Sequence, residues 1–155
     1  MADFATGALS WRISRKGCRQ GGPAGTQRKD GYWQLKIDRV ACLRHHIIWA
    51  MQHGEWPAFQ LDHRNRRRGE DWIDNLRPAT DQQQRANQRA RRPKSGFKGV
   101  ELAARCVSKP WRARIMVDKR VIRLGYFATA EEASAAYASA AKEHFGEYAH
   151  PGDGV

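Results

Sequence analysis

The stretch from Leu61 to Asn87 constrains the fold of this chain most, because it fixes an order of elements around two reactive side chains. It opens with a brief apolar strand at Leu61, and the strand ends in the adjacent pair Asp62 and His63. Residues 64–71 are polar and rich in arginine, as in a surface loop. Apolar residues between positions 72 and 76 then return the chain to a core as a second strand.

A helix is expected after this second strand. Thr80 and Gln83 have the spacing of a capping box, so the helix should begin at Thr80 and run to about Arg91. The predicted order is therefore strand, loop, strand and helix, with Asp62 and His63 facing the start of the helix.

Asp62 and His63 offer the chemistry of a metal-dependent hydrolase. A carboxylate supplies an anionic oxygen ligand, and an imidazole takes up protons near neutral pH. Between residues 64 and 94 there are ten Arg or Lys and only four Asp or Glu, so basic residues flank the pair on both sides. This placement favours contact with the phosphates of a nucleic acid.

The overall charge agrees with such a partner. The chain of 155 residues has 28 Lys and Arg against 16 Asp and Glu, a formal net charge of +12, which is more than solubility requires. A membrane surface is the rival partner, but it would need a basic amphipathic helix, whereas these arginines cluster in loops and strands. Because no run of about 18 apolar residues occurs, we expect no membrane span.

Three cysteines, Cys18, Cys42 and Cys106, lie far apart and form no C-x-x-C pair. Neither a disulfide framework nor a cysteine zinc site is indicated. The residues from position 1 to 10 also lack a basic start and an apolar core of a leader. We expect reduced thiols in a cytoplasmic protein.

The first third of the chain has little predicted structure before position 31. Residues 1–10 are expected to be weakly structured, and Trp11 to Ile13 to begin a short strand. Residues 32–37 alternate as a half-buried strand that residues 40–42 pair with as a hairpin. An amphipathic helix is predicted over residues 43–53, with Gly54 as its C-terminal stop.

Three histidines, His45, His46 and His53, lie on or beside this helix. No second pair of ligands at metal spacing accompanies them. Their pattern therefore favours packing against tryptophan, or contact with phosphate, over metal binding.

A second pattern begins after Gly96. Three strands are predicted, over residues 97–102, 111–117 and around 121–124, and Thr129 with Glu132 predicts a capped helix. The buried stripe of that helix is expected at Ala133, Ala136, Tyr137, Ala140 and His144. The helix would cover the apolar face of the sheet and leave Arg112, Arg114 and Arg123 on the other face.

Residues from about 11 to 92 resemble the HNH nucleases of the phage and homing-endonuclease kind. The resemblance rests on Leu43-Arg44-His45-His46-Ile47-Ile48-Trp49, on Leu61-Asp62-His63, and on Asp74-Asn75-Leu76-Arg77-Pro78-Ala79-Thr80. Asn75 follows His63 by 12 residues, which fits the family pattern.

The resemblance implies a ββα-metal fold that uses one divalent cation, Mg²⁺ or Mn²⁺, and no small-molecule cofactor. Asp62 would bind the metal through a carboxylate oxygen. His63 would act as general base on the attacking water. Asn75 would hold the loop that carries His63. Cleavage would leave 5′-phosphate and 3′-hydroxyl ends.

The second metal ligand departs from the family pattern. It usually comes from an Asn or His on the last helix, at a position that here falls on Gln84. Asn87 lies on the same helical face and is the other candidate. Either residue would present an amide oxygen.

Residues 95–150 look like an APETALA/ERF-type DNA-binding domain, through Ser95-Gly96-Phe97-Lys98-Gly99-Val100, Trp111-Arg112-Ala113-Arg114-Ile115 and Leu124-Gly125-Tyr126-Phe127. Glu101 stands where that family commonly has an arginine. The expected DNA contacts in the whole chain are Arg64, Arg66, Arg67, Arg68, Arg91, Arg92, Arg112, Arg114 and Arg123.

Together these patterns predict an α+β protein of two domains. A ββα-metal HNH nuclease domain would occupy residues 1–92, with its core from about 31. A basic linker of residues 93–96 would lead to a three-stranded antiparallel sheet with a helix over residues 97–150, and residues 151–155 would form a tail. The predicted function is a DNA endonuclease that nicks or cuts both strands of double-stranded DNA, as a monomer or homodimer. The alternative is a non-catalytic, sequence-specific DNA-binding protein on a nuclease scaffold.

Overall fold

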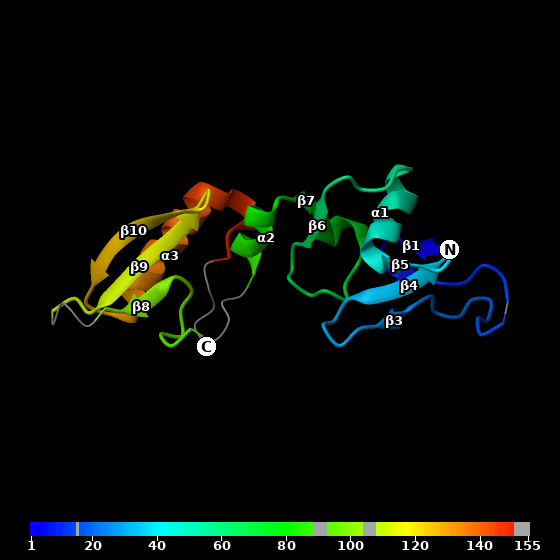
Figure 1. Ribbon diagram of the computed structural model, residues 1–155, viewed down its shortest axis with the longest axis horizontal. Coiled ribbons are helices and arrows are strands. Elements are labelled where there is room, and N and C mark those ends of the chain that lie inside the picture. Colours follow the sequence, from blue (N-terminus) through cyan, green and yellow to red (C-terminus); the bar gives the residue numbers. More distant parts are fainter. Residues whose placement is uncertain (15, 89–92, 104–107, 151–155) are drawn as a thin grey trace. The chain divides into compact units, whose positions relative to one another are not determined.

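A computed structural model describes residues 1–14, 16–88, 93–103 and 108–150 (Figure 1). Its contacts divide the chain into two compact units, Met1–Thr80 and Asp81–Val155. Both units contain helices and strands, and the described residues form small antiparallel sheets and three α-helices.

The first unit begins with a hairpin of β1 (Ala2–Asp3) and β2 (Ala8–Leu9), so the expectation of weak structure here was wrong. The Asp3 carboxylate accepts bonds from the backbone of Ala5 and from the Thr6 hydroxyl, which closes the turn. The strand expected from Trp11 is absent from the described residues 11–14. Position 11 is instead tied by backbone bonds to positions 21 and 22 across a glycine-rich loop.

The central sheet of this unit has the order β3 (Thr26–Gln27), β4 (Trp33–Ile37) and β5 (Val40–Leu43). The predicted hairpin is confirmed, and its two-residue turn, Asp38 and Arg39, has φ of 48° and 69°, as the right-handed twist of paired strands favours.

Helix α1 (Arg44–His53) follows directly and packs against β4 and β5 (Figure 1). It ends at Gly54, whose φ of 79° is the left-handed conformation that stops a helix. The predicted helix and its stop are confirmed. Its buried Ile47 and Ile48 join Leu35 and Leu76 in the core of the unit.

The strands around the two reactive residues are β6 (Gln60–His63) and β7 (Leu76–Ala79), which pair antiparallel. The 3₁₀ turn η1 (Ile73–Asn75) leads into β7. Because side chains alternate along a strand, Leu61 and His63 point to the buried side and Asp62 to the other.

Helix α2 (Asp81–Asn87) belongs to the second unit by its contacts, although its sequence predicts the last helix of a nuclease domain. Ala86 is buried with Ile115 and Tyr137 in a core of that unit. Lys98 donates from Nζ to the backbone oxygens of Ala86 and Gln88, 2.6 and 2.7 Å away. The rest of the expected helix, at positions 89–91, lies outside the described residues.

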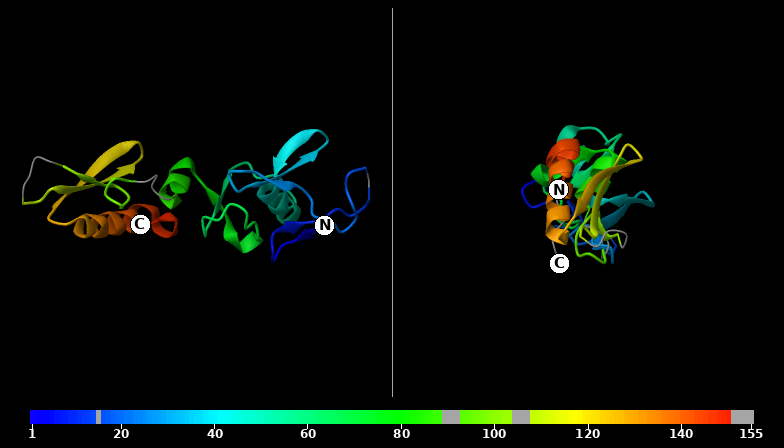
Figure 2. Two further views of the ribbon diagram at one scale, coloured as in Figure 1. Left: turned by 90° about the horizontal axis from the view of Figure 1, so that it is seen from below. Right: turned by 90° about the vertical axis from the view of Figure 1, so that its left-hand side faces the viewer.

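The remainder of the second unit is a sheet of order β10 (Arg120–Phe127), β9 (Trp111–Val117) and β8 (Val100–Leu102), all antiparallel. Helix α3 (Ala130–Phe145) packs on one face of it, as Figure 2 shows, and the turn η2 (Gly146–Tyr148) follows. The predicted strands and helix are present, although the first strand begins only at Val100 and positions 97–99 form a turn.

Thr129 caps α3 as predicted, since its hydroxyl accepts from the backbone of Glu132 and the Glu132 carboxylate accepts from the backbone of position 128. Of the predicted buried stripe, Ala133, Tyr137 and Ala140 are buried and Ala136 is half-buried, but the C-terminal end of the stripe was predicted wrongly. His144 is exposed, and Ala141 and Phe145 are buried instead, because they lie four and eight residues after the buried Tyr137.

Among the residues that the structure describes, no helix has the length and apolar character needed to cross a membrane.

Candidate active site

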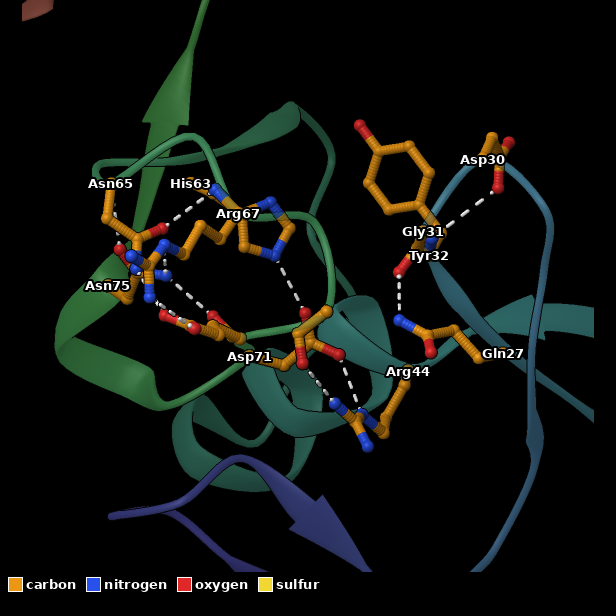
Figure 3. A network of polar contacts seen from close by, with 12 residues as sticks. Gln27, Asp30, Gly31, Tyr32, Arg44, His63, Asn65, Arg67, Asp71 and Asn75 are labelled. Atoms are coloured by element: carbon orange, nitrogen blue, oxygen red, sulfur yellow. Dashed lines mark hydrogen bonds and ion pairs between the residues drawn. The ribbon is translucent and has the colours of Figure 1, made fainter.

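His63 is the centre of the candidate site. β6 directs its ring into the interior, where only 4% of the residue is exposed. Its Nε2 lies 2.7 Å from Oδ1 of Asp71, a residue with 0% exposure in the loop between β6 and β7 (Figure 3). This pair brings together two residues that the sequence analysis had not connected.

Asp71 is held from its other side by Arg44, at the first turn of α1. The Arg44 Nε donates to Asp71 Oδ2 over 2.7 Å, and its Nη2 donates to the Gly69 backbone oxygen over 2.8 Å. The guanidinium lies 4.5 Å from the centre of the Trp33 ring. A buried line of contacts therefore runs from Arg44 through Asp71 to His63.

The charge of Asp71 follows from these contacts. Burial raises the pKa of the Asp71 carboxyl, but the hydrogen bonds from His63 and Arg44 and their positive charges lower it, and the net result is a pKa below the ordinary value. Asp71 is thus an anion at neutral pH.

The backbone around Asp71 is also closely packed. Gly7 has φ of 70°, and a Cβ at this position would lie 2.2 Å from the Asp71 carbonyl carbon. A glycine is required at this point, because the β1–β2 hairpin passes directly over the Asp71 backbone.

Asp71 and Arg44 are functional candidates that the sequence reasoning missed. Asp71 was counted as one of the polar residues of the 64–71 loop, and Arg44 was named only as part of the segment 43–49 that resembles HNH nucleases. The sequence contains a weak indication that Asp71 is buried, because Asp71 directly precedes Trp72, where apolar residues return the chain to the core.

Asp62 lies on the opposite side of β6 and pairs with Arg77, its cross-strand neighbour. Both Nε and Nη2 of Arg77 donate to Asp62 Oδ2 over 3.0 Å. Any ion bound by this carboxylate would share it with a guanidinium.

Asn75 is buried and makes the contacts of a loop anchor (Figure 3). Its Oδ1 accepts from the Asn65 backbone over 3.0 Å, and its Nδ2 donates to Asn65 Oδ1 and to the Glu70 backbone oxygen. These bonds hold both ends of the loop that joins His63 to Asp71.

The loop arginines are exposed, at positions 64, 66, 67 and 68. Arg67 contacts Glu70 over 3.1 Å. Arg68 donates to the Asp30 backbone oxygen and lies 5.0 Å from the Tyr32 ring centre. Arg91 and Arg92 lie outside the described residues.

Gln84 and Asn87, the expected second metal ligands, both lie on α2. Gln84 is half-buried and Asn87 is buried. Contacts group this helix with the second unit, whereas Asp62 and His63 belong to the first.

Two of the three helix histidines pack against tryptophan, as expected. The His53 ring stacks on Trp49 with centres 4.0 Å apart, and the His46 ring meets Trp56 edge-on at 5.7 Å. His45 differs, because it is 3% exposed and its ring centre lies 5.2 Å from that of His63.

The sequence interpretation of His45 has to be corrected. His45, His63 and Asp71 each place a ligand atom within 4.8 Å of the others, so the partners that seemed to be missing come from β6 and the loop. Burial, with smaller effects from His46 and His63, lowers the pKa of His45 to about 3. Its imidazole is therefore neutral at physiological pH.

In the second unit, the three arginines expected to contact DNA lie on β9 and β10, with Arg114 and Arg123 directly paired in register. Arg112 donates from Nε and Nη2 to Glu101 Oε1, and Arg114 lies 3.3 Å from Glu101 Oε2. The hydrogen bonds that Arg112 donates to Glu101, followed by its hydrogen bond with Tyr126, raise the pKa of Arg112. Glu101 thus forms ion pairs with both Arg112 and Arg114.

Comparison with known proteins finds a match to a family model. Residues 42–86 match the family model of HNH endonucleases, a segment that includes Arg44, His63 and Asp71. No curated protein and no solved structure matches the chain. The family match supports a nuclease domain of the HNH type at residues 42–86, with DNA as its substrate.

Proposed function

We propose that this protein is a metal-dependent DNA endonuclease of the phage or homing type, in which His63 is the general base. The observation that carries the proposal is the buried His63–Asp71 pair, with 2.7 Å between Nε2 and Oδ1, inside the segment that matches HNH endonucleases. Histidine is the most frequent general base in enzymes because its pKa lies near neutral pH.

Asp71 is the positioning residue for this base. An ionised carboxylate can only accept, so the ring proton of neutral His63 is held on Nε2. The lone pair then lies on Nδ1, the nitrogen with which the ring would take a proton from water. Arg44 fixes the carboxylate in turn through Oδ2.

The oxygen donors of the chain suit a hard divalent cation such as Mg²⁺ or Mn²⁺. Asp62 would bind it by a carboxylate oxygen. When bound, such an ion stabilises negative charge on the phosphate and on the leaving 3′ oxygen. Asn75 would keep the loop between His63 and Asp71 in place while DNA binds.

Phosphate contact would come from the exposed arginines of the loop, Arg64, Arg66, Arg67 and Arg68, and from Arg91 and Arg92. The second unit would position the nuclease as a DNA-binding domain of the APETALA/ERF type. Arg112, Arg114 and Arg123 would contact phosphates and guanine edges there. A monomer would nick one strand and a homodimer would cut both.

The proposal is tested by conversion of supercoiled plasmid to nicked and linear forms with Mg²⁺ or Mn²⁺. We expect cleavage with either ion and none with excess EDTA, and the ratio of nicked to linear product reports on strand usage. Absence of cleavage under every divalent ion, with DNA binding intact, would overturn the enzyme proposal.

A second candidate is a non-catalytic DNA-binding protein on the same scaffold. The observation that favours it is the pair of bonds from Arg77 to Asp62 Oδ2, because a guanidinium on a ligand carboxylate opposes a cation. Both proteins would bind DNA in a salt-dependent way, since that binding depends on the basic residues. Only the nuclease would break DNA when a divalent ion is added.

The Glu101 contacts lead to a prediction for DNA binding. We expect Glu101→Gln to raise affinity for DNA, because it releases Arg112 and Arg114 from an anionic partner. With two more arginines neutralising phosphates, the slope of log K against log salt should steepen by up to about 2. Titration of labelled duplex DNA at several salt concentrations, without divalent ions, measures both quantities.

Glu131→Gln is the matched control, since it makes the same change of charge at an exposed position on α3. Equal gains in both variants would mean that net charge alone matters, and would exclude a role of the Glu101 contacts.

A further inference from the structure

His45 has a buried ring nitrogen whose hydrogen-bonding capacity is not used. Its Nδ1 has no hydrogen-bond partner among the residues that the structure describes, although a buried polar atom of this kind costs about 1–3 kcal/mol when it is left unpaired. The His45 ring lies beside other aromatic rings, and its centre is 4.4 Å from that of His46 and 5.4 Å from that of Tyr32. Such an atom points to a ligand that supplies the missing interaction.

The groups next to His45 are themselves suited to a metal. His63 and Asp71 complete a set in which the three ligand atoms all lie within 4.8 Å of one another, and all three residues are buried. The second oxygen of Asp71 accepts from Arg44 over 2.7 Å. Carboxylates that bind metals are commonly fixed in this way by a hydrogen bond to the other oxygen.

We propose that His45, His63 and Asp71 bind a divalent transition-metal ion of the Zn²⁺ type. Two imidazole nitrogens and one carboxylate oxygen are the ligands of three-residue zinc sites, in which a fourth position is left for water or substrate. Mg²⁺ prefers oxygen ligands, so this site is chemically distinct from the proposed site of Asp62.

The ion would regulate the nuclease, and this consequence rests on the proposed function. Zn²⁺ would take the place of the proton between Nε2 of His63 and Oδ1 of Asp71, now 2.7 Å apart, and that proton would move to Nδ1 of the same ring. The ring would be tied to the ion in a new orientation and could no longer be positioned by Asp71 as a base. Zn²⁺ should therefore inhibit cleavage that Mg²⁺ supports.

Binding is measured on the full chain, without DNA, by calorimetry with Zn²⁺ and by the visible absorption of Co²⁺ as a probe of tetrahedral sites. We expect one ion per chain. His45→Gln should weaken binding by more than about 100-fold, beyond the effect of losing an outer hydrogen bond. His53→Gln is the matched control, because His53 is exposed on the same helix and lies outside the cluster.

Nitrogen NMR of the histidine rings tests the same claim in the wild-type chain, without reliance on a variant that folds. Zn²⁺ should shift the Nδ1 resonance of His45 and leave that of His53 in place. Absence of binding, unshifted His45 resonances, or equal affinities of the two glutamine variants would each overturn the site.

Inhibition of DNA cleavage is measured in an experiment separate from the binding measurements. Plasmid nicking with Mg²⁺ is titrated with Zn²⁺, and each variant is compared with its own rate before Zn²⁺ is added. Inhibition should need more than about 100-fold higher Zn²⁺ in His45→Gln, in line with its weaker binding. A chain that binds Zn²⁺ through His45 but never cleaves DNA would overturn the nuclease proposal and leave the metal site standing.

Discussion

Replacement of His63 by alanine is expected to lower the rate of metal-dependent DNA cleavage by about 10²–10⁴-fold, the usual contribution of a general base. The loss should appear in kcat and leave KM nearly unchanged, because a buried ring with 4% exposure offers little surface to DNA. Single-turnover cleavage of a plasmid with saturating Mg²⁺ measures the chemical step, and DNA titration without metal measures binding.

His53→Ala is the control for this loss. His53 is exposed at the end of α1, and its ring stacks on Trp49 away from Asp71, so we expect cleavage close to that of the wild type. His63→Gln separates chemistry from folding, since it keeps a polar group of similar size beside Asp71. Undiminished cleavage in His63→Ala would exclude this residue as the base.

The largest effect on stability is expected for Asp71→Ala. This change removes the carboxylate between Arg44 and His63 and leaves the Arg44 guanidinium, 9% exposed, without its ionic partner. Breaking one side of a buried ion pair costs about 3–5 kcal/mol of unfolding free energy. Urea unfolding followed by tryptophan fluorescence measures the loss, because five of the six tryptophans belong to the first unit.

Two further variants test whether the loss of stability comes from the contacts of Asp71 with Arg44 and His63. Asp74→Ala makes the same substitution three residues later at an exposed position, and it should cost less than about 0.5 kcal/mol. Arg44→Met combined with Asp71→Ala should recover part of the loss, because the uncompensated charge is removed. Equal destabilisation by Asp71→Ala and Asp74→Ala would contradict a structural role of the Arg44–Asp71–His63 line.

The role of Asp71 can also be tested through the pH dependence of the free energy of unfolding. The pKa of Asp71 in the folded chain lies below its ordinary value of 3.8, so its stabilising contribution is fully present above pH 3.8. That contribution is lost as the pH falls through the folded-state value. Asp71→Asn should therefore flatten the acid limb of the stability curve.

The local elements were predictable because their causes lie close together in the chain. Alternation over residues 33–37, the turn at Asp38 and Arg39, the stop at Gly54 and the Thr129 cap each involve residues a few positions apart. Backbone geometry limits such short segments to few conformations. The pair Asp62 and His63 could be found for the same reason, since both lie at the end of one strand.

Contacts between distant segments were not predictable in this way. The N-terminal hairpin is set by packing that brings the Phe4 backbone to Ile73, and α2 joins the second unit through Ala86 and Lys98. Glu101 meets two arginines only because β8 and β9 pair in that register.

The amino-acid sequence was sufficient to infer most helices and strands after position 31, the clustering of basic residues and the adjacent Asp62 and His63. The contacts of His63 with Asp71, of Asp71 with Arg44, and the position of His45 beside them became visible only in the folded chain. Arg44 and Asp71 are 27 residues apart, and His63 and Asp71 are joined through a polar loop of no regular period. These residues come into contact because α1, β6 and the loop pack against one another through the apolar residues next to them. Such packing produces no periodic pattern in the sequence from which the contacts could be predicted.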